Sequence, residues 1–236
     1  MSGYHASLFR DARRAPPPVS AAALRGLRAE IARIERSGPY GAAPEASGIA
    51  LDLPAVDAAF PPGVLARAAL HEISGGAAHG FALRLLARRP GPVLWVHPVR
   101  RAEALYGPGV EGLGGGLAER LMIARARSAE EGLWAAEEGL RSGALSAVAL
   151  EPDKAVGLTA SRRLQLAAER GGALCLILPG EGAAEARLSH SAAASRWRVD
   201  PAPADVSGPA TVRRWDVRLL RRRGGGAGAW RVEAGA

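Results

Sequence analysis

The sequence predicts an α/β fold with a mostly parallel β-sheet, and two observations support this fold class. From residue 69 onward, short apolar runs alternate with longer amphipathic segments of helical period. Apolar runs without polar alternation are typical of strands that are buried on both faces. Strands that alternate with helices favour a parallel sheet with right-handed crossovers. A chain of 236 residues is long enough to bury the core of one such domain.

Each element of this fold follows from its own local pattern. Apolar runs predict strands at residues 69–73, 92–97, 121–124, 145–150 and 173–178. Amphipathic periods predict helices at 80–88, 100–106, 128–141 and 159–170, and the glycine-rich stretch 107–116 is expected to be a loop. Ser128 and Thr159 are the expected N-caps of the last two helices, because a hydroxyl accepts a hydrogen bond from the first helical turn.

The C-terminal end changes from helical period to alternation. Trp215, Val217 and Leu219 alternate with charged residues, and Trp230 and Val232 alternate after a glycine loop. This pattern predicts a C-terminal antiparallel hairpin that extends the sheet. Residues 195–199 are a further candidate strand.

The N-terminal region is predicted to stand apart from the core. A helix is expected over residues 20–36, with Gly38 and Pro39 ending it and a Gly/Ala/Pro-rich linker following to about residue 48. We therefore expect two parts: a mobile N-terminus, helix and linker over 1–48, and the core with its hairpin over 49–236. The helix has a 3-4-3 apolar stripe, typical of a seam, which either docks a partner or folds back on the core. The stripe consists of Leu24, Leu27, Ile31 and Ile34.

A glycine frame separates the first predicted core strand from its helix. Gly75 and Gly80 have the G-x-x-x-x-G spacing of a phosphate-cradling loop, the P-loop. The predicted degenerate phosphate loop is Gly75, Gly76, Ala77, Ala78, His79 and Gly80. A working P-loop continues with Lys and Ser/Thr, which contact the phosphates and Mg²⁺, but here Phe81 and Ala82 follow.

The sequence also lacks a lysine that could serve a P-loop elsewhere in the chain. Lys154 is the only lysine and has no glycine loop beside it. We therefore expect no ATP hydrolysis and no catalytic residues, which leaves open that ATP binds without being cleaved. An ordinary strand-to-helix turn is the alternative interpretation of the frame.

Glu151 is the one acid that follows a predicted strand where a Walker B carboxylate would stand. A surface acid at a loop start is the alternative. The strand 92–97 ends in His97 and Pro98, which supply no carboxylate to orient water. The five histidines lack metal-ligand spacing, so no metal site is expected. His71 and His97 are predicted to be core histidines, while His79 in the glycine turn is the histidine of functional interest.

The remaining composition limits where the protein works. The five tryptophans are expected in the core, and Cys175 is expected in a buried strand. A single cysteine cannot form an internal disulfide and fits a reducing cytoplasm. No apolar run approaches the roughly 20 residues of a membrane span, so no membrane partner is expected.

The net charge of +8 is concentrated toward the two ends of the chain. This distribution indicates contact with nucleic acid or an acidic partner, and a solvated surface is the alternative. The predicted contact residues of the hairpin are Arg213, Arg214, Arg218, Arg221, Arg222 and Arg223.

Several stretches of the chain resemble the ImuA family, RecA-like proteins of the inducible mutagenesis cassette of bacteria. The most specific block spans residues 158–169. Further matching blocks lie at 70–73, 92–95, 105–108, 133–138, 195–199 and 221–225. The resemblance implies a RecA-like P-loop fold and a non-hydrolysing accessory role in SOS-induced, error-prone translesion DNA synthesis. It also implies an ImuB-like Y-family polymerase homologue and an error-prone replicative-type DNA polymerase as partners, with RecA, DNA and a second copy of the chain as further candidates.

Two other functions remain open at this point. A cell-division inhibitor of the SulA type would share the reduced RecA-like core. An active recombinase-type, DNA-dependent ATPase would use the glycine frame and Glu151, although Phe81 opposes it.

Overall fold

The computed structural model describes residues 20, 26, 49–59, 65–101, 105–180, 191–205, 212–223 and 226–233. The chain divides into two units, Met1–Ala42 and Ala43–Ala236, and the second unit contains the sheet. The predicted boundary between residues 48 and 49 stays a prediction. In the predicted N-terminal helix only Ser20 and Gly26 are described, and Gly26 is helical. The apolar stripe Leu24, Leu27, Ile31 and Ile34 lies outside the described residues.

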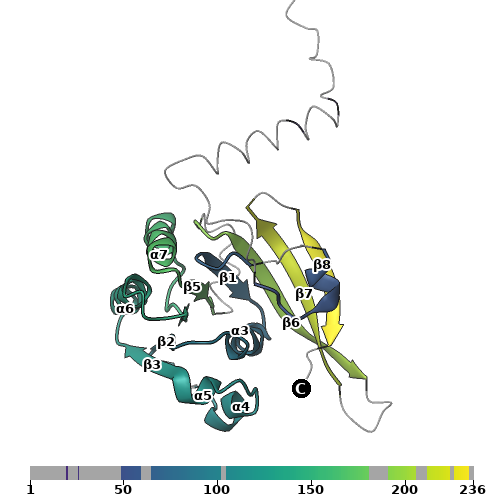
Figure 1. Ribbon diagram of the computed structural model, residues 1–236, viewed down its shortest axis with the longest axis horizontal. Coiled ribbons are helices and arrows are strands. Elements are labelled where there is room, and N and C mark those ends of the chain that lie inside the picture. Colours follow the sequence, from purple (N-terminus) through teal and green to yellow (C-terminus); the bar gives the residue numbers. More distant parts are fainter. Residues whose placement is uncertain are drawn as a thin grey trace, which may run out of the picture. The chain divides into compact units, whose positions relative to one another are not determined.

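The described residues of the second unit form an eight-stranded sheet in the order β3-β2-β4-β5-β1-β6-β7-β8 (Figure 1). The strands are β1 Leu70–Ser74, β2 Val93–Pro98, β3 Leu121–Ala126, β4 Ala147–Leu150, β5 Leu174–Ile177, β6 Ser195–Asp205, β7 Val212–Arg222 and β8 Gly228–Glu233. Neighbours from β3 to β6 are parallel, whereas β7 pairs antiparallel with β6 and β8. This arrangement confirms the predicted α/β fold with a mostly parallel sheet and a C-terminal antiparallel hairpin.

Helices cover the two faces of the parallel part of the sheet (Figure 1). The helices are α2 Pro54–Asp57, α3 Ala78–Ala87, α4 Gly107–Glu111, α5 Leu117–Arg120, α6 Ala129–Arg141 and α7 Leu158–Gly171. On one side, α3 packs Phe81 and Leu86 into a core with Trp95 and Leu176. On the other side, α6 and α7 enclose a second core. Because both faces are covered, the central strands carry continuous apolar runs.

Of the two predicted N-cap residues, one is confirmed by the structure and the other is wrong. The Ser128 hydroxyl accepts a hydrogen bond from the Glu131 amide at 3.1 Å, as predicted for the N-cap of α6. The predicted Thr159 cap is wrong, because α7 begins at Leu158 after Gly157 and has no side-chain cap bond. Residues 102–104 of the helix predicted at 100–106 lie outside the described residues. Tyr106 is a cap rather than a helical residue, and α4 occupies part of the predicted loop, where a proline suits the first helical turn.

The tryptophans are not all in the core, which corrects a second prediction. Trp95 and Trp197 are fully buried, but the side chain of Trp134 is 63% exposed. The helix α6 buries Gly132, Ala136 and Leu140 toward the sheet. Trp134 lies two residues from both Gly132 and Ala136, so the 100° step of a helix places it on the opposite side. Cys175 is buried as predicted, and burial raises the pKa of its thiol.

No helix within the described ranges is long and apolar enough to cross a lipid bilayer.

Candidate functional site

The glycine loop joins β1 to α3 through Gly75, Gly76 and Ala77. Gly75 has a φ of +100°, and a Cβ there would overlap the carbonyl oxygen of Val199 on β6. A residue with a side chain would therefore suffer both backbone strain and a collision. The loop needs glycine at this position because it lies directly against the neighbouring strand.

The amides of the loop donate to acceptors within the protein. The Ala77 amide donates to the Val199 carbonyl at 3.0 Å, and the Ala78 amide donates to the Gly75 carbonyl at 3.1 Å. The Gly76 amide donates to Asp200 Oδ1 at 3.3 Å. In a working P-loop, amides of this kind point at the phosphates. Here the Asp200 carboxylate, which also accepts a hydrogen bond from Arg198 Nε at 2.7 Å, occupies the Gly76 amide, so that amide is engaged within the protein.

The helix after the loop begins early and turns its next residues into the core. Ala78, His79 and Gly80 already belong to α3. Phe81 is 3% exposed and packs edge-on against Trp215, with 5.7 Å between the ring centroids. Ala82 is fully buried. The two positions that would carry the P-loop lysine and hydroxyl are therefore part of the apolar packing of α3. Nucleotide binding by residues 75–80 stays a prediction.

Glu151 directly follows β4 and is surrounded by donors from three other segments. Its side chain is 4% exposed. Trp95 Nε1 donates to Oε1 at 2.6 Å, and Arg101 Nη1 donates to Oε2 at 3.5 Å. His79 Nε2 and His97 Nδ1 each lie 3.3 Å from Oε2. We refer to Glu151 with Trp95, His79, His97 and Arg101 as the Glu151 cluster.

The surroundings of Glu151 keep its carboxylate charged. Burial alone raises the pKa of Glu151, but the hydrogen bonds from His79 and Trp95, together with the charges of His79 and His97, outweigh it, so the pKa is below its ordinary value. His97 Nε2 lies 3.2 Å from the Arg101 carbonyl oxygen, which can only accept a hydrogen bond. The His97 ring therefore donates to both of its neighbours only in the doubly protonated form.

The Glu151 cluster occupies the edge where a RecA-like ATPase would handle Mg²⁺ and water. A metal-binding carboxylate needs open lone pairs, but Glu151 faces N–H donors on both oxygens. Among the residues that the structure describes, no group of three or more His, Cys, Asp or Glu side chains is arranged to hold a metal ion. A Cβ at Gly180, beyond the end of β5, would overlap the Arg101 guanidinium, so Arg101 also packs against that strand end.

The sequence pointed to some members of this cluster and missed others. Glu151 and His79 were expected at the site, and His97 was recognised as lacking a carboxylate. Trp95, Arg101 and Asp200 were not expected. The position of His97 and Glu151 at the carboxyl ends of neighbouring parallel strands was the available signal for their contact.

His71 is a core histidine, as predicted. Its Nδ1 accepts a hydrogen bond from the Ser195 hydroxyl at 2.6 Å, and its Nε2 donates to the Ala66 carbonyl at 2.9 Å. Trp197 Nε1 donates to the same hydroxyl oxygen at 2.7 Å. Burial lowers the pKa of His71 to about 4, so the ring is neutral at pH 7.

The predicted hairpin arginines are divided between the two faces of the sheet. Residues paired across antiparallel strands share a face, so Arg218 lies beside Arg198 and Arg221 beside Arg196. Arg213 lies on the Trp215 side, and Arg222 pairs with Ser195. We define the arginine face by the members of β6, β7 and β8 that share one side: Arg196, Arg198, Arg214, Arg218, Arg221 and Arg231.

Carboxylates also lie along the arginine face. Asp216 binds Arg231 through two hydrogen bonds at 2.8 and 2.9 Å. Glu72 binds Arg196 at 2.6 Å, and Glu233 lies 3.9 Å from Arg214. The arginine face is therefore basic but partly neutralised, and its exposed members include Arg218 and Arg221.

Comparison with known proteins places the chain in a family. No protein-family profile matches it. The chain is 39% identical over 205 residues to the protein ImuA of two Caulobacter vibrioides strains, covering 77% of this chain and 81% of the relative. The crystal structure of SulA from Pseudomonas aeruginosa superposes with a TM-score of 0.39 and 22% identity, over 47% of this chain and 97% of SulA. On the identity and coverage of the Caulobacter proteins, the chain belongs to the ImuA family.

Proposed function

We propose that the protein is a non-hydrolysing RecA-like accessory protein of SOS-induced, error-prone translesion DNA synthesis. It acts together with an ImuB-like Y-family polymerase homologue and an error-prone replicative-type DNA polymerase. Membership of the ImuA family supports this role. The observation that carries the non-hydrolysing part is the burial of Phe81 and Ala82, at 3% and 0% exposure, where a lysine and a hydroxyl would have to reach a nucleotide.

Phosphoryl transfer requires a cation at the γ-phosphate, bound Mg²⁺ and a positioned water. The loop lacks the lysine, and Glu151 is occupied by Trp95 and Arg101. Asp200, which is paired with Arg198, accepts the hydrogen bond of the Gly76 amide. These features favour a structural role, in which the loop holds α3, β4 and β6 together. They do not favour a role in binding ATP. A protein with such a core acts through its surfaces, as an adaptor.

The direct test of this role is a mutagenesis assay in a strain from which the gene has been deleted. We expect the intact gene to restore mutations induced by DNA damage. We also expect Glu151→Gln, which removes the charge of a Walker B carboxylate, to restore them to the same level. If mutagenesis is restored by the intact gene but lost with a folded Glu151→Gln protein, the site has a catalytic role and the non-hydrolysing proposal is wrong.

The partner-docking part of the proposal has its own test. We propose that the stripe Leu24, Leu27, Ile31 and Ile34 binds the ImuB-like partner, because 3-4-3 apolar spacing suits a helix seam. Leu27→Asp with Ile31→Asp should abolish co-purification of the partner by the full-length protein. The matched control is Arg28→Ala, in the same segment but outside the stripe, which should leave co-purification intact. Equal loss in both proteins, or in neither, would contradict the seam.

A further inference from the structure

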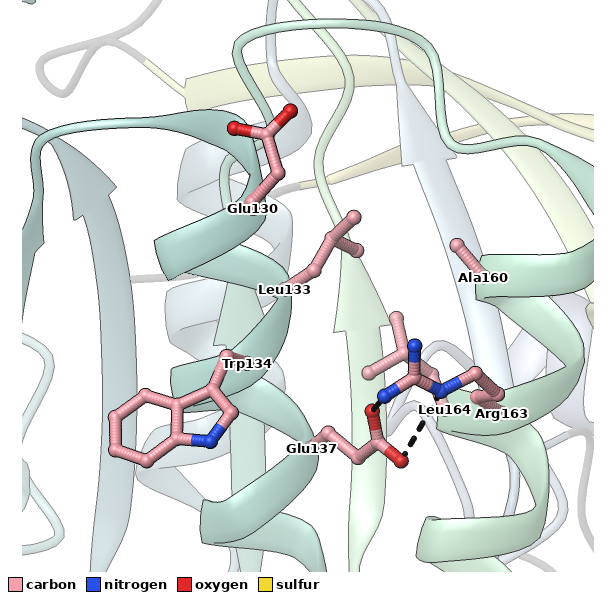
Figure 2. A pocket seen from close by; sticks show the side chains of 7 residues that line it. All are labelled: Glu130, Leu133, Trp134, Glu137, Ala160, Arg163 and Leu164. Atoms are coloured by element: carbon pink, nitrogen blue, oxygen red, sulfur yellow. Dashed lines mark hydrogen bonds and ion pairs between the residues drawn. The ribbon is translucent and has the colours of Figure 1, made fainter.

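The helices α6 and α7 form a groove on the outer side of the sheet that the proposed function does not use. Figure 2 shows Leu133 extending from α6 toward α7, and Glu137 and Arg163 meeting across the gap. The groove contains a cavity of about 170 Å³. It is lined by Glu130, Leu133, Trp134, Glu137, Ala160, Arg163 and Leu164.

Both walls of the groove are faces of helices. The lining positions on α6 are 130, 133, 134 and 137, and those on α7 are 160, 163 and 164. These spacings of three and four residues each define one ridge of a helix. A third helix can pack its own ridge between two such ridges. An added strand would need unpaired backbone groups, which helix walls do not offer.

An ion pair at one end gives the groove a fixed shape. Glu137 is 3% exposed, and its carboxylate binds Arg163 of α7 as well as Arg141, whose Nη2 lies 2.5 Å from Oε1. A buried carboxylate held by two guanidiniums ties the helices together at this level. We therefore expect the cavity next to this ion pair to persist between α6 and α7.

The size and chemistry of the cavity define what would fill it. An apolar cavity of about 150 Å³ in another protein takes up benzene, so a space of this size accepts one aromatic or leucine side chain. Leu133, Ala160 and Leu164 make the space apolar. Trp134 is 63% exposed beside it, and exposed tryptophans are enriched among residues that dominate binding energy.

The charges of the groove are not balanced. Arg163 is already paired with Glu137. Glu130 is exposed, and Lys154 is the basic residue whose charge acts on it. The pKa of Glu130 is lowered by hydrogen bonds from its own amide and from Ser128, so its carboxylate is charged. A basic side chain on the occupant would complement it.

We propose that the groove between α6 and α7 binds an amphipathic helix of a partner protein, which inserts one Phe- or Leu-sized side chain between Leu133 and Leu164 and sets a Lys or Arg against Glu130. This site is separate from the glycine loop and the arginine face, so it stands or falls independently of the proposed function.

The probe is an alanine-based helical peptide of about 16 residues, long enough to form a helix, with a central Phe and an Arg four residues to either side. Binding to the full-length protein is followed by NMR shifts of the methyl groups of Leu133 and Leu164 and of the Trp134 indole. We expect saturable shifts at these three residues. Replacing the peptide's Phe by Ala should weaken binding about tenfold or more, and replacing both Arg by Glu should weaken it as well.

Variants of the protein complete the test. Both Trp134→Ala and Glu130→Gln change exposed side chains and should weaken binding while leaving the thermal unfolding of the protein intact. The matched control is Leu220→Ala on β7, another exposed apolar residue, which should bind the peptide normally. The proposal is overturned if the Phe peptide does not bind at millimolar concentration, if its Ala version binds equally well, or if Trp134→Ala leaves the affinity unchanged.

Discussion

At the scale of single residues, His71 links the stability of the core to pH. Its ring is buried and neutral, with a pKa lowered by burial from 6.5 to about 4. Between these two pH values the unfolded chain binds a proton that the folded chain does not. The free energy of unfolding therefore rises with pH across this window and falls as the solution is acidified.

We expect this titration to contribute about 3 kcal/mol of stability at pH 7 that is fully lost below pH 4. Urea unfolding at a series of pH values measures the effect. His71→Gln lacks the titration, so its stability should change less between pH 4 and pH 6.5 than that of the natural protein. Parallel profiles for the two proteins would show that His71 is not the group responsible.

Gly75 is the residue that allows the loop to lie against β6. We expect Gly75→Ala to destabilise the protein by about 3 kcal/mol, because a φ of +100° strains the backbone and the new Cβ meets the Val199 carbonyl. Gly143→Ala is the matched control. Its φ is +66° with nothing within 4 Å of the new Cβ, so only the left-handed strain of about 1 kcal/mol should appear. Equal losses in chemical denaturation would contradict the close approach of the loop to β6.

At the scale of elements, the pairing of α6 with α7 depends on a buried charge. We expect Glu137→Ala to cost about 2 kcal/mol, because it removes the carboxylate that joins Arg141 and Arg163, whose side chains are themselves 45% and 61% exposed. The neighbouring Glu138 is 49% exposed and pairs only with Arg141, so Glu138→Ala should cost less than about 1 kcal/mol. Thermal unfolding of the two variants compares them directly. A loss for Glu138→Ala as large as that for Glu137→Ala would contradict this account.

Local patterns were sufficient to predict most elements of the core. The apolar runs predicted β1, β2, β4 and β5 because strands covered on both faces carry no polar alternation, and Ser128 marked the start of α6. An apolar run also predicted β3, although Met122 and Ile123 are 47% and 51% exposed in this edge strand. The predicted Thr159 cap was wrong because a hydroxyl near the start of a helix does not determine which residue is the first with helical backbone angles. The prediction that Trp134 is a core residue was wrong because it was based on the size and apolar character of the side chain. Its position in the helix places it on the outer side of α6.

The candidate site was less predictable, because its contacts join distant parts of the chain. Asp200 reaches the Gly76 amide across 124 residues of sequence. Trp95 reaches Glu151 across 56 residues. Periodicity and motif spacing report only local geometry. The glycine frame could therefore predict a turn of the P-loop kind. The candidate strand at 195–199 was also predicted, but no local pattern indicated that this strand, β6, pairs with β1 beside the loop.

At the scale of the whole molecule, the sheet extends beyond its parallel core into β6, β7 and β8. There Arg218 and Arg221 are exposed on the arginine face. The partial neutralisation of that face by Asp216 and Glu72 means that the exposed arginines dominate any interaction with a polyanion. We propose that this face contacts DNA phosphates.

If this proposal is correct, single-stranded DNA should bind about tenfold or more weakly when salt rises from about 50 mM to about 200 mM. Arg218→Glu with Arg221→Glu should weaken binding and flatten the salt dependence, measured by fluorescence anisotropy. Arg127→Glu is the matched control, because Arg127 is 83% exposed but lies before α6, away from the arginine face. Binding that is independent of salt, or lost equally in the control, would contradict a phosphate interface on the hairpin.

The central claim is that the glycine loop is closed by its own protein and cannot support phosphoryl transfer. Phosphate release from ATP by the purified full-length chain, with and without single-stranded DNA, tests it most directly. The account predicts release no greater than that of a Glu151→Gln preparation shown by circular dichroism to be folded. Steady turnover by the natural protein that the folded Glu151→Gln protein lacks would contradict it.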